Sequence, residues 1–224
     1  MACWSRLLDD VIIGSNGFGA HIDDLKKVFD RLQQHHLAIK LSKCKFFRKK
    51  LIYLGHEISK DGVRPDPEKV TAIAQMKPPM NIHGLRRFLG LTSYYRRFIA
   101  NYAQVAEPLT CLLRKNNLYK WNSNSQKAFE ELKQHLVEVP ILAYPDFKQP
   151  FQLYTDASTY GLGAILSQSK SQGDQVIAYA SRTMNKAERN YSTTERECTG
   201  HPSITFNHTS SMGGGSPLSL TIVH

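Results

Sequence analysis

The amino-terminal third of the chain combines strand-like and helix-like patterns of apolar residues. Residues 7–13 place the pair Asp9-Asp10 between two short apolar runs, which predicts a β-hairpin with the two acids at its turn. Residues 20–36 then carry apolar side chains at intervals of three and four, as in a helix with one buried face. We therefore expect a hairpin followed by an amphipathic helix.

Strand patterns return beyond this helix. Residues 37–47 alternate between apolar and polar side chains. A second hairpin follows, with one strand over residues 51–58, a turn at residues 60–62 and a returning strand that starts at Val63.

The next segment predicts a helix with a defined start and end. Asp66 is a favourable N-cap and Pro67 a favourable first helical residue. The helix should stop near residues 77–79, where two prolines follow a lysine. Asn81 is placed to cap the helix that comes next.

Helical spacing continues over residues 85–113. We expect breaks in this stretch near Gly90 and again near Asn101. A further helix is predicted to open at Ser123 or Ser125 and to end at Pro140.

The pattern then changes to strands. Residues 151–156 alternate strictly, and residues 161–168 and 176–181 have the composition of two further strands. Residues 192–195 read Ser-Thr-Thr-Glu, a capping box that predicts a helix with Glu197 in its first turns.

The composition changes abruptly after Glu197. No Lys, Arg, Asp or Glu follows it, and residues 199–224 consist largely of Ser, Thr, Gly and His, with a glycine run at 213–215. We expect this tail to be disordered, with the character of a foreign or frame-shifted end.

The overall charge favours a polyanionic partner. The formal net charge is +10 and the sequence pI is about 9.5, which suits nucleic acid or an anionic membrane surface. No apolar run approaches the roughly 20 residues of a membrane span, and the amino terminus lacks the layout of a secretion signal. The four cysteines contain no CxxC pair, which argues against a zinc site or a disulfide framework. We therefore expect an intracellular compartment, and nucleic acid as the partner in preference to a membrane.

Acidic residues supply the candidate chemistry. Adjacent carboxylates such as Asp9 and Asp10 can share a Mg²⁺ ion with phosphate oxygens, although an exposed turn pair is the alternative. Asp156 ends an alternating strand, and a carboxylate facing inward there would need a partner or a metal, although a turn or capping aspartate is the alternative. Glu197 by itself reads as a glutamate on a helix surface.

Basic residues form two sets that suit phosphate contacts. One is a run without acids, made of Lys40, Lys43, Lys45, Arg48, Lys49 and Lys50. In the other, Arg86-Arg87 and Arg96-Arg97 bracket Tyr94-Tyr95 on successive predicted helical turns. Arg and Lys can neutralise phosphates while Tyr stacks or lies in a minor groove. A solvated basic face is the alternative.

The order of short motifs resembles the Ty3/gypsy-type retrotransposon pol polyprotein over roughly residues 5 to 198. The motifs are Leu8-Asp9-Asp10-Val11-Ile12-Ile13, Leu54-Gly55-His56-Glu57-Ile58-Ser59, Phe88-Leu89-Gly90-Leu91, Tyr94-Tyr95-Arg96-Arg97-Phe98-Ile99, Thr155-Asp156-Ala157-Ser158, Gly161-Leu162-Gly163-Ala164 and Tyr179-Ala180-Ser181-Arg182.

This resemblance implies roles for individual residues. Asp9 and Asp10 match the paired aspartates of a reverse-transcriptase palm, and Leu54-Gly55-His56 matches the hairpin that grips the primer end. In the thumb, Gly90 and Tyr94 match the face that follows the minor groove of the primer–template duplex. With the two arginine pairs, the implied nucleic-acid-binding set is Leu54, Gly55, His56, Arg86, Arg87, Gly90, Tyr94, Tyr95, Arg96 and Arg97.

The resemblance extends to a second catalytic domain from about residue 115. Asp156 matches the first catalytic aspartate of an RNase H domain and Glu197 its catalytic glutamate. In the complete enzyme both acidic sites would hold Mg²⁺ and act on a primer–template duplex or an RNA–DNA hybrid by two-metal phosphoryl transfer.

Departures from the family pattern bear on activity. The family's polymerase site needs a third aspartate from an earlier strand, Leu7 stands where the family has an aromatic residue, and residues 1–6 lack the expected strand pattern. The RNase H site needs aspartates beyond Glu197, and none follows. We expect weak or absent Mg²⁺ binding and no activity from this chain alone.

We expect an α/β (α+β) fold in four parts: a palm remnant at residues 1–63, a helical thumb at 64–114, the opening strands of an RNase H-like mixed sheet at 115–198, and the tail at 199–224. The main functional hypothesis is an inactive piece of a reverse transcriptase–RNase H. A non-catalytic nucleic-acid-binding module and a product of a decayed element without selected function are the alternatives. The sequence does not indicate an oligomeric state.

Overall fold

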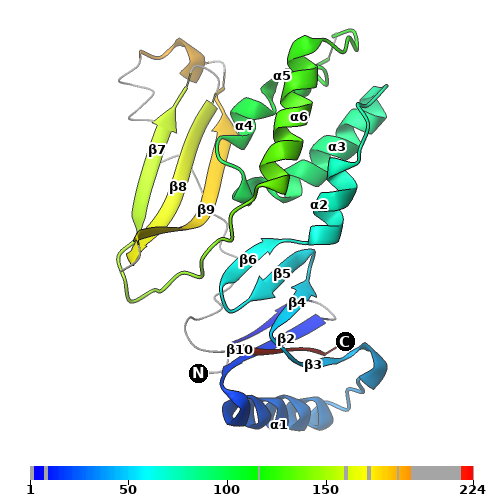
Figure 1. The fold of residues 1–224 in the computed structure, drawn as a ribbon, viewed down its shortest axis with the longest axis vertical. Coiled ribbons are helices and arrows are strands. Elements are labelled where there is room, and N and C mark those ends of the chain that lie inside the picture. Colours follow the sequence, from blue (N-terminus) through cyan, green and yellow to red (C-terminus); the bar gives the residue numbers. More distant parts are fainter. Residues whose placement is uncertain are drawn as a thin grey trace. The chain divides into compact units, whose positions relative to one another are not determined.

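The computed structural model describes residues 3–7, 10–115, 117–158, 161–170, 173–185, 187–192 and 218–223. These residues form two compact units. Unit 1 contains the described residues up to Arg64, the segment Ala143–Lys148 and the strand at the carboxyl end. Unit 2 contains Pro65–Leu142 and the described residues from Gln149 to Ser192. Figure 1 shows the elements of both.

Unit 1 begins with the predicted hairpin. Strands β1 (Cys3–Leu7) and β2 (Asp10–Asn16) pair in antiparallel register, and the last pair joins Leu7 to Asp10. Two residues therefore separate the strands, which confirms a tight hairpin. The expectation that residues 1–6 lack a strand was wrong, because β2 offers a long apolar partner along which Cys3–Leu7 can form a ladder.

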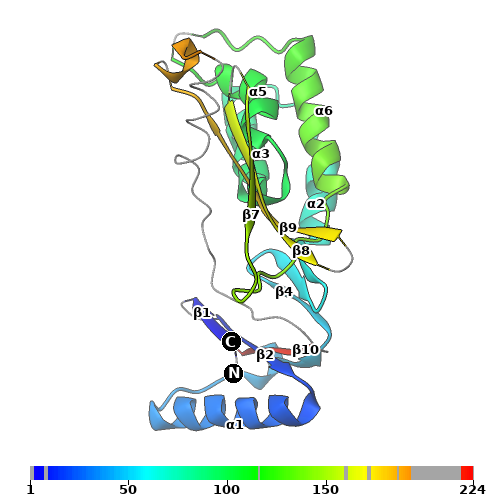
Figure 2. The same ribbon diagram turned by 90° about the vertical axis from the view of Figure 1, so that its left-hand side faces the viewer.

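Helix α1 (Phe18–Gln34) confirms the predicted amphipathic helix and contacts β2. Figure 2 shows it lying along one face of the sheet that contains β2. Ile13 and Leu25 are buried between them, together with partly buried apolar side chains that include Phe29.

Polar groups are buried under the same helix. The Ser15 hydroxyl donates to Asp24 Oδ2 at 2.8 Å, and His21 Nδ1 lies 3.1 Å from Ser15 Oγ. Lys27 Nζ lies 3.1 Å from Asp24 Oδ1. Burial by itself would raise the pKa of Asp24, but the hydrogen bonds from Ser15 and Lys27 outweigh it and hold that pKa below its ordinary value. The network therefore joins α1 to β2 with its polar groups satisfied.

The alternating stretch 37–47 is a strand only at its end. Leu41–Lys43 form a short 3₁₀ turn, and β3 (Lys45–Arg48) follows. Leu37 and Leu41 are exposed, so the alternation has no sheet face to bury. The prediction for the first part of this stretch was wrong because no neighbouring strand is available there.

The second predicted hairpin is a meander of three short strands. They are β4 (Lys50–Tyr53), β5 (His56–Ser59) and β6 (Gly62–Pro65). Leu54 and Gly55 both have positive φ, at 46° and 69°, and form a two-residue turn between β4 and β5. The prediction of one strand over residues 51–58 was therefore wrong, whereas the turn at residues 60–62 is confirmed.

A second apolar cluster lies behind this meander. Ile12, Leu51, Tyr53 and Ile58 are buried together, and Tyr144 packs against them. The Tyr144 hydroxyl also donates to the Ser59 carbonyl at 2.9 Å. Residues far apart in the sequence thus complete the core of unit 1.

The prediction that the whole tail at residues 199–224 is disordered was wrong at its carboxyl end. Leu218–Val223 form strand β10, which pairs with β2 and with β3 and gives the sheet order β1-β2-β10-β3. Figure 1 shows β10 next to β2. The uncharged alternating pattern of these residues suits a strand once a partner edge is present. The rest of the predicted tail lies outside the described residues.

Unit 2 opens with the two predicted capped helices. Asp66 accepts from the Glu68 amide at 3.0 Å at the start of α2 (Pro67–Ala74). Asn81 accepts from the Gly84 amide at 2.8 Å at the start of α3 (Ile82–Tyr94). Both caps are confirmed.

The breaks in the long helical stretch are only partly as predicted. Helix α3 continues through Gly90, because its buried residues on either side hold it in place. The helix ends at Tyr94, and a 3₁₀ turn at Arg96–Phe98 follows. Asn101 adopts a left-handed backbone with φ of 51°, which confirms the second break. Two short helices follow it: α4 (Tyr102–Val105) and α5 (Glu107–Cys111).

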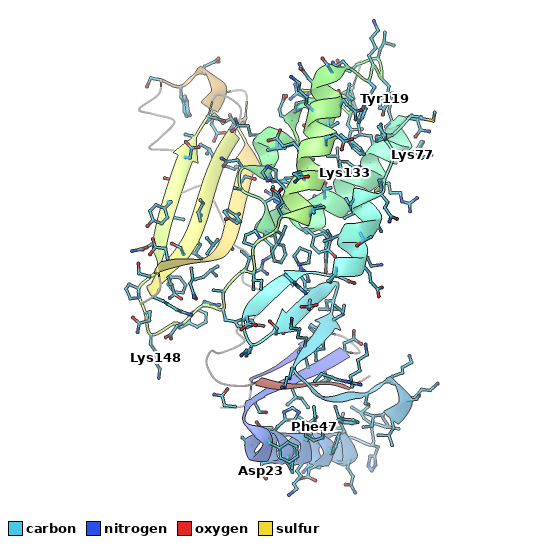
Figure 3. The ribbon with its side chains drawn as sticks, in the orientation of Figure 1. Asp23, Phe47, Lys77, Tyr119, Lys133 and Lys148 are labelled. Atoms are coloured by element: carbon cyan, nitrogen blue, oxygen red, sulfur yellow. The ribbon has the colours of Figure 1, made fainter. Side chains whose placement is uncertain are left out.

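Helix α6 (Ser123–Val137) supplies the centre of the helical core. It starts at Ser123 as predicted, with the cap provided by Asn122. Phe129 on α6 is fully buried, and its ring centroid lies 4.5 Å from that of Phe88 on α3. Figure 3 draws the side chains of this helix and labels Lys133, whose Nζ donates to the Met76 carbonyl at 3.1 Å.

The predicted strands of the last region form an antiparallel sheet in the order β7-β8-β9. They are β7 (Gln152–Ala157), β8 (Gly161–Lys170) and β9 (Gly173–Thr183). Near the end of β9, Arg182 forms a two-point ion pair with Glu188, at 2.7 and 2.8 Å, which holds the pKa of Glu188 at about 2. The predicted helix around Glu197 lies outside the described residues.

Helix α4 and the turn Arg96–Phe98 contact this sheet. The Ala103 amide donates to Ser181 Oγ at 3.0 Å, and Arg96 donates to the Ser181 carbonyl. A Cβ atom placed on Gly163 of β8 would overlap Asn101 Oδ1, so the Asn101 side chain lies directly on that glycine. Within the part of the chain that the structure describes, no helix is long and apolar enough to cross a membrane.

Replacing Asp24 with Ala should lower the free energy of unfolding by about 1–3 kcal/mol, because the buried Ser15 hydroxyl would lose its acceptor. The matched control is Asp23→Ala, since Asp23 is exposed on the same helix (Figure 3) and should change stability by less than about 0.5 kcal/mol. The pKa of Asp24 is depressed, so its contribution is present above the ordinary aspartate range and is lost as pH falls through the folded-state pKa. Urea unfolding at several pH values measures both effects; equal losses in the two variants would contradict the network.

Replacing Gly163 with Ala should lower stability by about 1–3 kcal/mol, because the methyl group displaces Asn101. Asn101→Gly keeps the left-handed backbone and removes the obstacle, so in that background the cost of Gly163→Ala should shrink by more than about 0.5 kcal/mol. Gly90→Ala is the control, since no atom lies within 4 Å of its added Cβ, and a helical alanine should stabilise by about 0.5–1 kcal/mol. A thermal-unfolding double-mutant cycle tests the contact, and additive effects would argue against it.

Candidate nucleic-acid and metal sites

The hairpin of β1 and β2 places Asp10 at the start of a buried strand. Asp10 is half-buried and pairs with Leu7 across the hairpin. The Tyr53 hydroxyl lies 3.4 Å from the Asp10 carbonyl oxygen, which ties this end of β2 to the meander. Asp9 lies outside the described residues, so the structure describes only Asp10 of the predicted carboxylate pair.

Asp156 lies on β7, where it pairs with Gly163 of β8. Its side chain is exposed, so of the two readings of Asp156 the buried, inward-facing carboxylate does not hold. The reason is that β7 is an edge strand and, apart from its last residue, is exposed along its length. Asp156 lines a small hollow together with Asn101, Gln104 and Ser181.

The described residues do not assemble a metal site. No group of three or more His, Cys, Asp or Glu side chains lies close enough to hold an ion within the described ranges. Asp10 and Asp156 belong to different units, and Glu197, like Asp9, lies outside the described residues. A two-metal centre needs several carboxylates around each pair of ions. The described residues by themselves therefore do not form the Mg²⁺ sites that the family resemblance implies.

Helix α3 presents an exposed stripe. His83, Arg87, Gly90 and Tyr94 follow at intervals of four, three and four residues, which places them on one side of the helix. All four are exposed, as is the neighbouring Arg86. We call His83, Arg86, Arg87, Gly90 and Tyr94 the α3 stripe.

The stripe has the shape and charge of a surface that a polyanion can approach closely. No atom lies within 4 Å of the position that a Cβ would take at Gly90, so the helix backbone is accessible there. The Tyr94 side chain is 52% exposed. Arg86 and Arg87 add two positive charges beside this opening.

Tyr95, Arg96 and Arg97, the remaining members of the predicted aromatic and arginine set, lie beyond the end of α3. Tyr95 is only 3% exposed, and burial raises its pKa to about 12. Arg96 bonds to the Ser181 carbonyl, and Arg97 lies 5.7 Å from the Phe98 ring centroid. Burial lowers the pKa of Arg97. The prediction that both arginine pairs lie on successive turns of one helix was wrong, because α3 ends at Tyr94.

The turn between β4 and β5 is the other predicted contact for nucleic acid. Leu54 is 40% exposed at its tip, and the His56 Nδ1 atom lies 2.8 Å from the Leu54 carbonyl. The left-handed backbone of Leu54 and Gly55 gives the turn a fixed shape. The structure thus provides the hairpin that the family resemblance implied at this position.

The basic run of unit 1 is exposed throughout. Its members are Lys40, Lys43, Lys45, Arg48, Lys49 and Lys50. Lys50 lies 3.8 Å from Glu57, at the edge of ion-pair distance.

His83 was not predicted as a site residue, although its spacing from Arg87, Gly90 and Tyr94 is visible in the sequence once the helix start at Asn81 is fixed.

Comparison with protein families gives two matches. Residues 2–58 match the family described as reverse transcriptase (RNA-dependent DNA polymerase). Residues 121–204 match the family described as RNase H-like domain found in reverse transcriptase.

Full-length relatives are transposon polyproteins. The retrovirus-related Pol polyprotein from transposon opus of Drosophila melanogaster is 42% identical over 203 residues, covering 85% of this chain and 20% of that protein. The corresponding protein from transposon gypsy is 40% identical and covers 85% and 19%. The transposon Tf2-3 polyprotein of Schizosaccharomyces pombe is 37% identical and covers 85% and 14%. The chain thus spans about a fifth or less of the length of these relatives.

Solved structures give the same picture. The foamy viral protease-reverse transcriptase in complex with RNA/DNA hybrid aligns with a TM-score of 0.77 and 25% identity, over 88% of this chain and 27% of that one. The foamy viral protease-reverse transcriptase dRH in complex with double-stranded DNA also aligns with a TM-score of 0.77 and 25% identity, over 86% and 34%. The chain is therefore similar to retrotransposon Pol polyproteins, with residues 2–58 matching the reverse transcriptase family and residues 121–204 the RNase H-like domain found in reverse transcriptases.

Proposed function

We propose that this chain binds a nucleic-acid duplex, of the primer–template or RNA–DNA hybrid kind, and that the α3 stripe carries the contact. The observation behind the proposal is the exposed side of α3, where Gly90 leaves the helix backbone open between Arg87 and Tyr94. A duplex can come close to the helix there. Arginine guanidinium groups can then reach phosphates while the tyrosine ring lies against sugars and base edges.

Three further observations support this proposal. The chain carries a formal net charge of +10. The basic run of unit 1 is exposed and therefore available to phosphates. The aligned foamy viral proteins were solved in complex with double-stranded DNA and with RNA/DNA hybrid. The Leu54-Gly55-His56 turn is proposed as a second contact, at a primer end.

The proposed division of labour follows the family resemblance. Residues 1–63 are assigned to the end of a palm, residues 64–114 to a thumb and residues 115–198 to an RNase H-like region. The boundary between the two compact units at Arg64 and Pro65 lies beside the first of these divisions. An intracellular compartment, where RNA and DNA are both present, is part of the same proposal.

Catalysis by this chain alone is not part of the proposal. In the complete enzyme, Asp9 and Asp10 would bind Mg²⁺ in the polymerase site, and Asp156 and Glu197 would bind it in the RNase H site. Mg²⁺ would supply charge stabilisation to the phosphoryl group there. The chain offers two carboxylates toward each site, and Asp156 is exposed and has no group of acids around it among the described residues, an arrangement that holds a divalent ion weakly.

Replacing both Arg86 and Arg87 with Ala should weaken duplex binding at low salt for all sequences and reduce the slope of log K against log salt by up to about 2. Tyr94→Ala should weaken binding with little change in that slope. Fluorescence anisotropy with a labelled RNA–DNA hybrid, repeated over a salt series, measures both. The control is Lys120→Ala with Lys127→Ala, which removes two exposed positive charges elsewhere in unit 2. If the two double variants weaken binding equally, net charge rather than the α3 stripe determines affinity.

The purified chain should show neither primer extension nor cleavage of RNA in a hybrid when Mg²⁺ is supplied. Asp10→Asn and Asp156→Asn should leave these baselines unchanged, while duplex binding persists. Gel assays with labelled primer and labelled RNA measure the two reactions. Extension that Asp10→Asn abolishes, or cleavage that Asp156→Asn abolishes, would overturn the proposal of an inactive chain without touching the binding proposal.

A further inference from the structure

Strand β2 has two edges to pair, and the carboxyl end of the chain covers one of them. Strand β1 pairs along the first edge. Strand β10 pairs along the second through six consecutive residue pairs, from Leu218 with Asn16 to Val223 with Val11. Ile12 and Ile13 in the middle of β2 are fully buried. Buried backbone amides and carbonyls need partners, so the second edge cannot be left open at little cost.

Strand β3 depends on the same segment. The sheet order is β1-β2-β10-β3, so β3 joins the sheet through β10 and not through β2. Its ladder with β10 is short, with the pairs Leu220–Arg48 and Ile222–Lys45 and an irregularity between them. Neighbouring strands lie about 4.8 Å apart. β2 and β3 are therefore separated by the width of one strand, which defines a slot.

The segment that fills the slot has a sequence that favours aggregation when it is unpaired. Residues 218–223 read Leu-Ser-Leu-Thr-Ile-Val, without charge, Pro or Gly. Short uncharged segments of high β-propensity pair readily with exposed strand edges when they are free. In the slot, the backbone of residues 218–223 forms the ladder that the second edge of β2 would otherwise lack.

We infer that the space between β2 and β3 is a strand-acceptor site and that residues 218–223 of the same chain occupy it as a detachable strand. The site takes an extended, uncharged strand of six residues that runs antiparallel to β2. Docking joins β3 to the sheet and prevents the second edge of β2 from pairing with another copy of the chain. This interaction is separate from the proposed duplex binding.

The register gives a direct test in the full-length chain. Gly14 and Leu220 are paired across the two strands. Directly opposite residues on antiparallel strands have Cα atoms about 4.5–5.5 Å apart, within the range that a disulfide spans. In a background with the native cysteines replaced by Ser, Gly14→Cys with Leu220→Cys should form an intramolecular disulfide under mild oxidation.

The control pair is shifted by one residue. Gly14→Cys with Thr221→Cys places the two thiols on opposite faces of the sheet, so it should cross-link far less. Non-reducing gels and mass spectrometry of peptides distinguish the outcomes. Equal yields from both pairs, or no cross-link from either, would overturn the docking. A disulfide that joins two chains would overturn occupation by the same chain.

A second experiment tests whether the strand is detachable. A chain that ends at Ser216 should self-associate at lower concentration than the full-length chain, because the second edge of β2 is exposed. A synthetic peptide of residues 217–224 should return it to the monomeric state, and the same peptide with Thr221→Pro should not, since proline removes a ladder donor. Sedimentation velocity measures this. A shortened chain with unchanged association and unchanged melting temperature would contradict the inference; if it fails to fold, the cross-linking test still decides.

Discussion

The backbone of β2 must find hydrogen-bond partners along both of its edges, because the strand runs through the interior of unit 1. This constraint determines most of the unit. One edge recruits β1 and so forms the hairpin that carries Asp10. The other edge recruits β10, and β3 follows. The faces of the same strand carry Ile12 and Ile13, which belong to two separate apolar clusters. Those clusters hold the β4–β6 meander and α1.

Local features of the sequence predicted the elements that local interactions specify. The caps at Asp66 and Asn81 depend on residues within a few positions, and both are present. The features that failed depend on distant partners. Residues 37–47 alternate like a strand, but a strand forms only from Lys45, where β10 is available to pair. Propensity cannot reveal a neighbour that lies about 170 residues further along the chain.

The candidate sites show the same division. The positions of Asp10 and Asp156 at strand ends followed from the pattern of apolar residues. The family resemblance, and not the helical spacing, placed Gly90 and Tyr94 on one face of the thumb, and both are exposed on α3. The burial of Tyr95 did not, because it depends on where α3 ends and on how the chain turns afterwards. The sequence therefore predicted which strands and helices carry the candidate site residues, but it overestimated how many of the aromatic and basic side chains face outward together.

Unit 1 also has an unusual assembly order. Its described residues come from the first 64 positions, from Ala143–Lys148 and from the last few residues of the chain. A ribosome makes these pieces in sequence, so β2 emerges long before the strand that covers its second edge. Until β10 has been synthesised, the nascent chain carries an unpaired edge of β2, while the residues of unit 2 that precede β10 are already available to fold. Contacts between such distant segments form slowly, and the waiting period is the stage at which chaperone binding or misassembly between neighbouring nascent chains is expected.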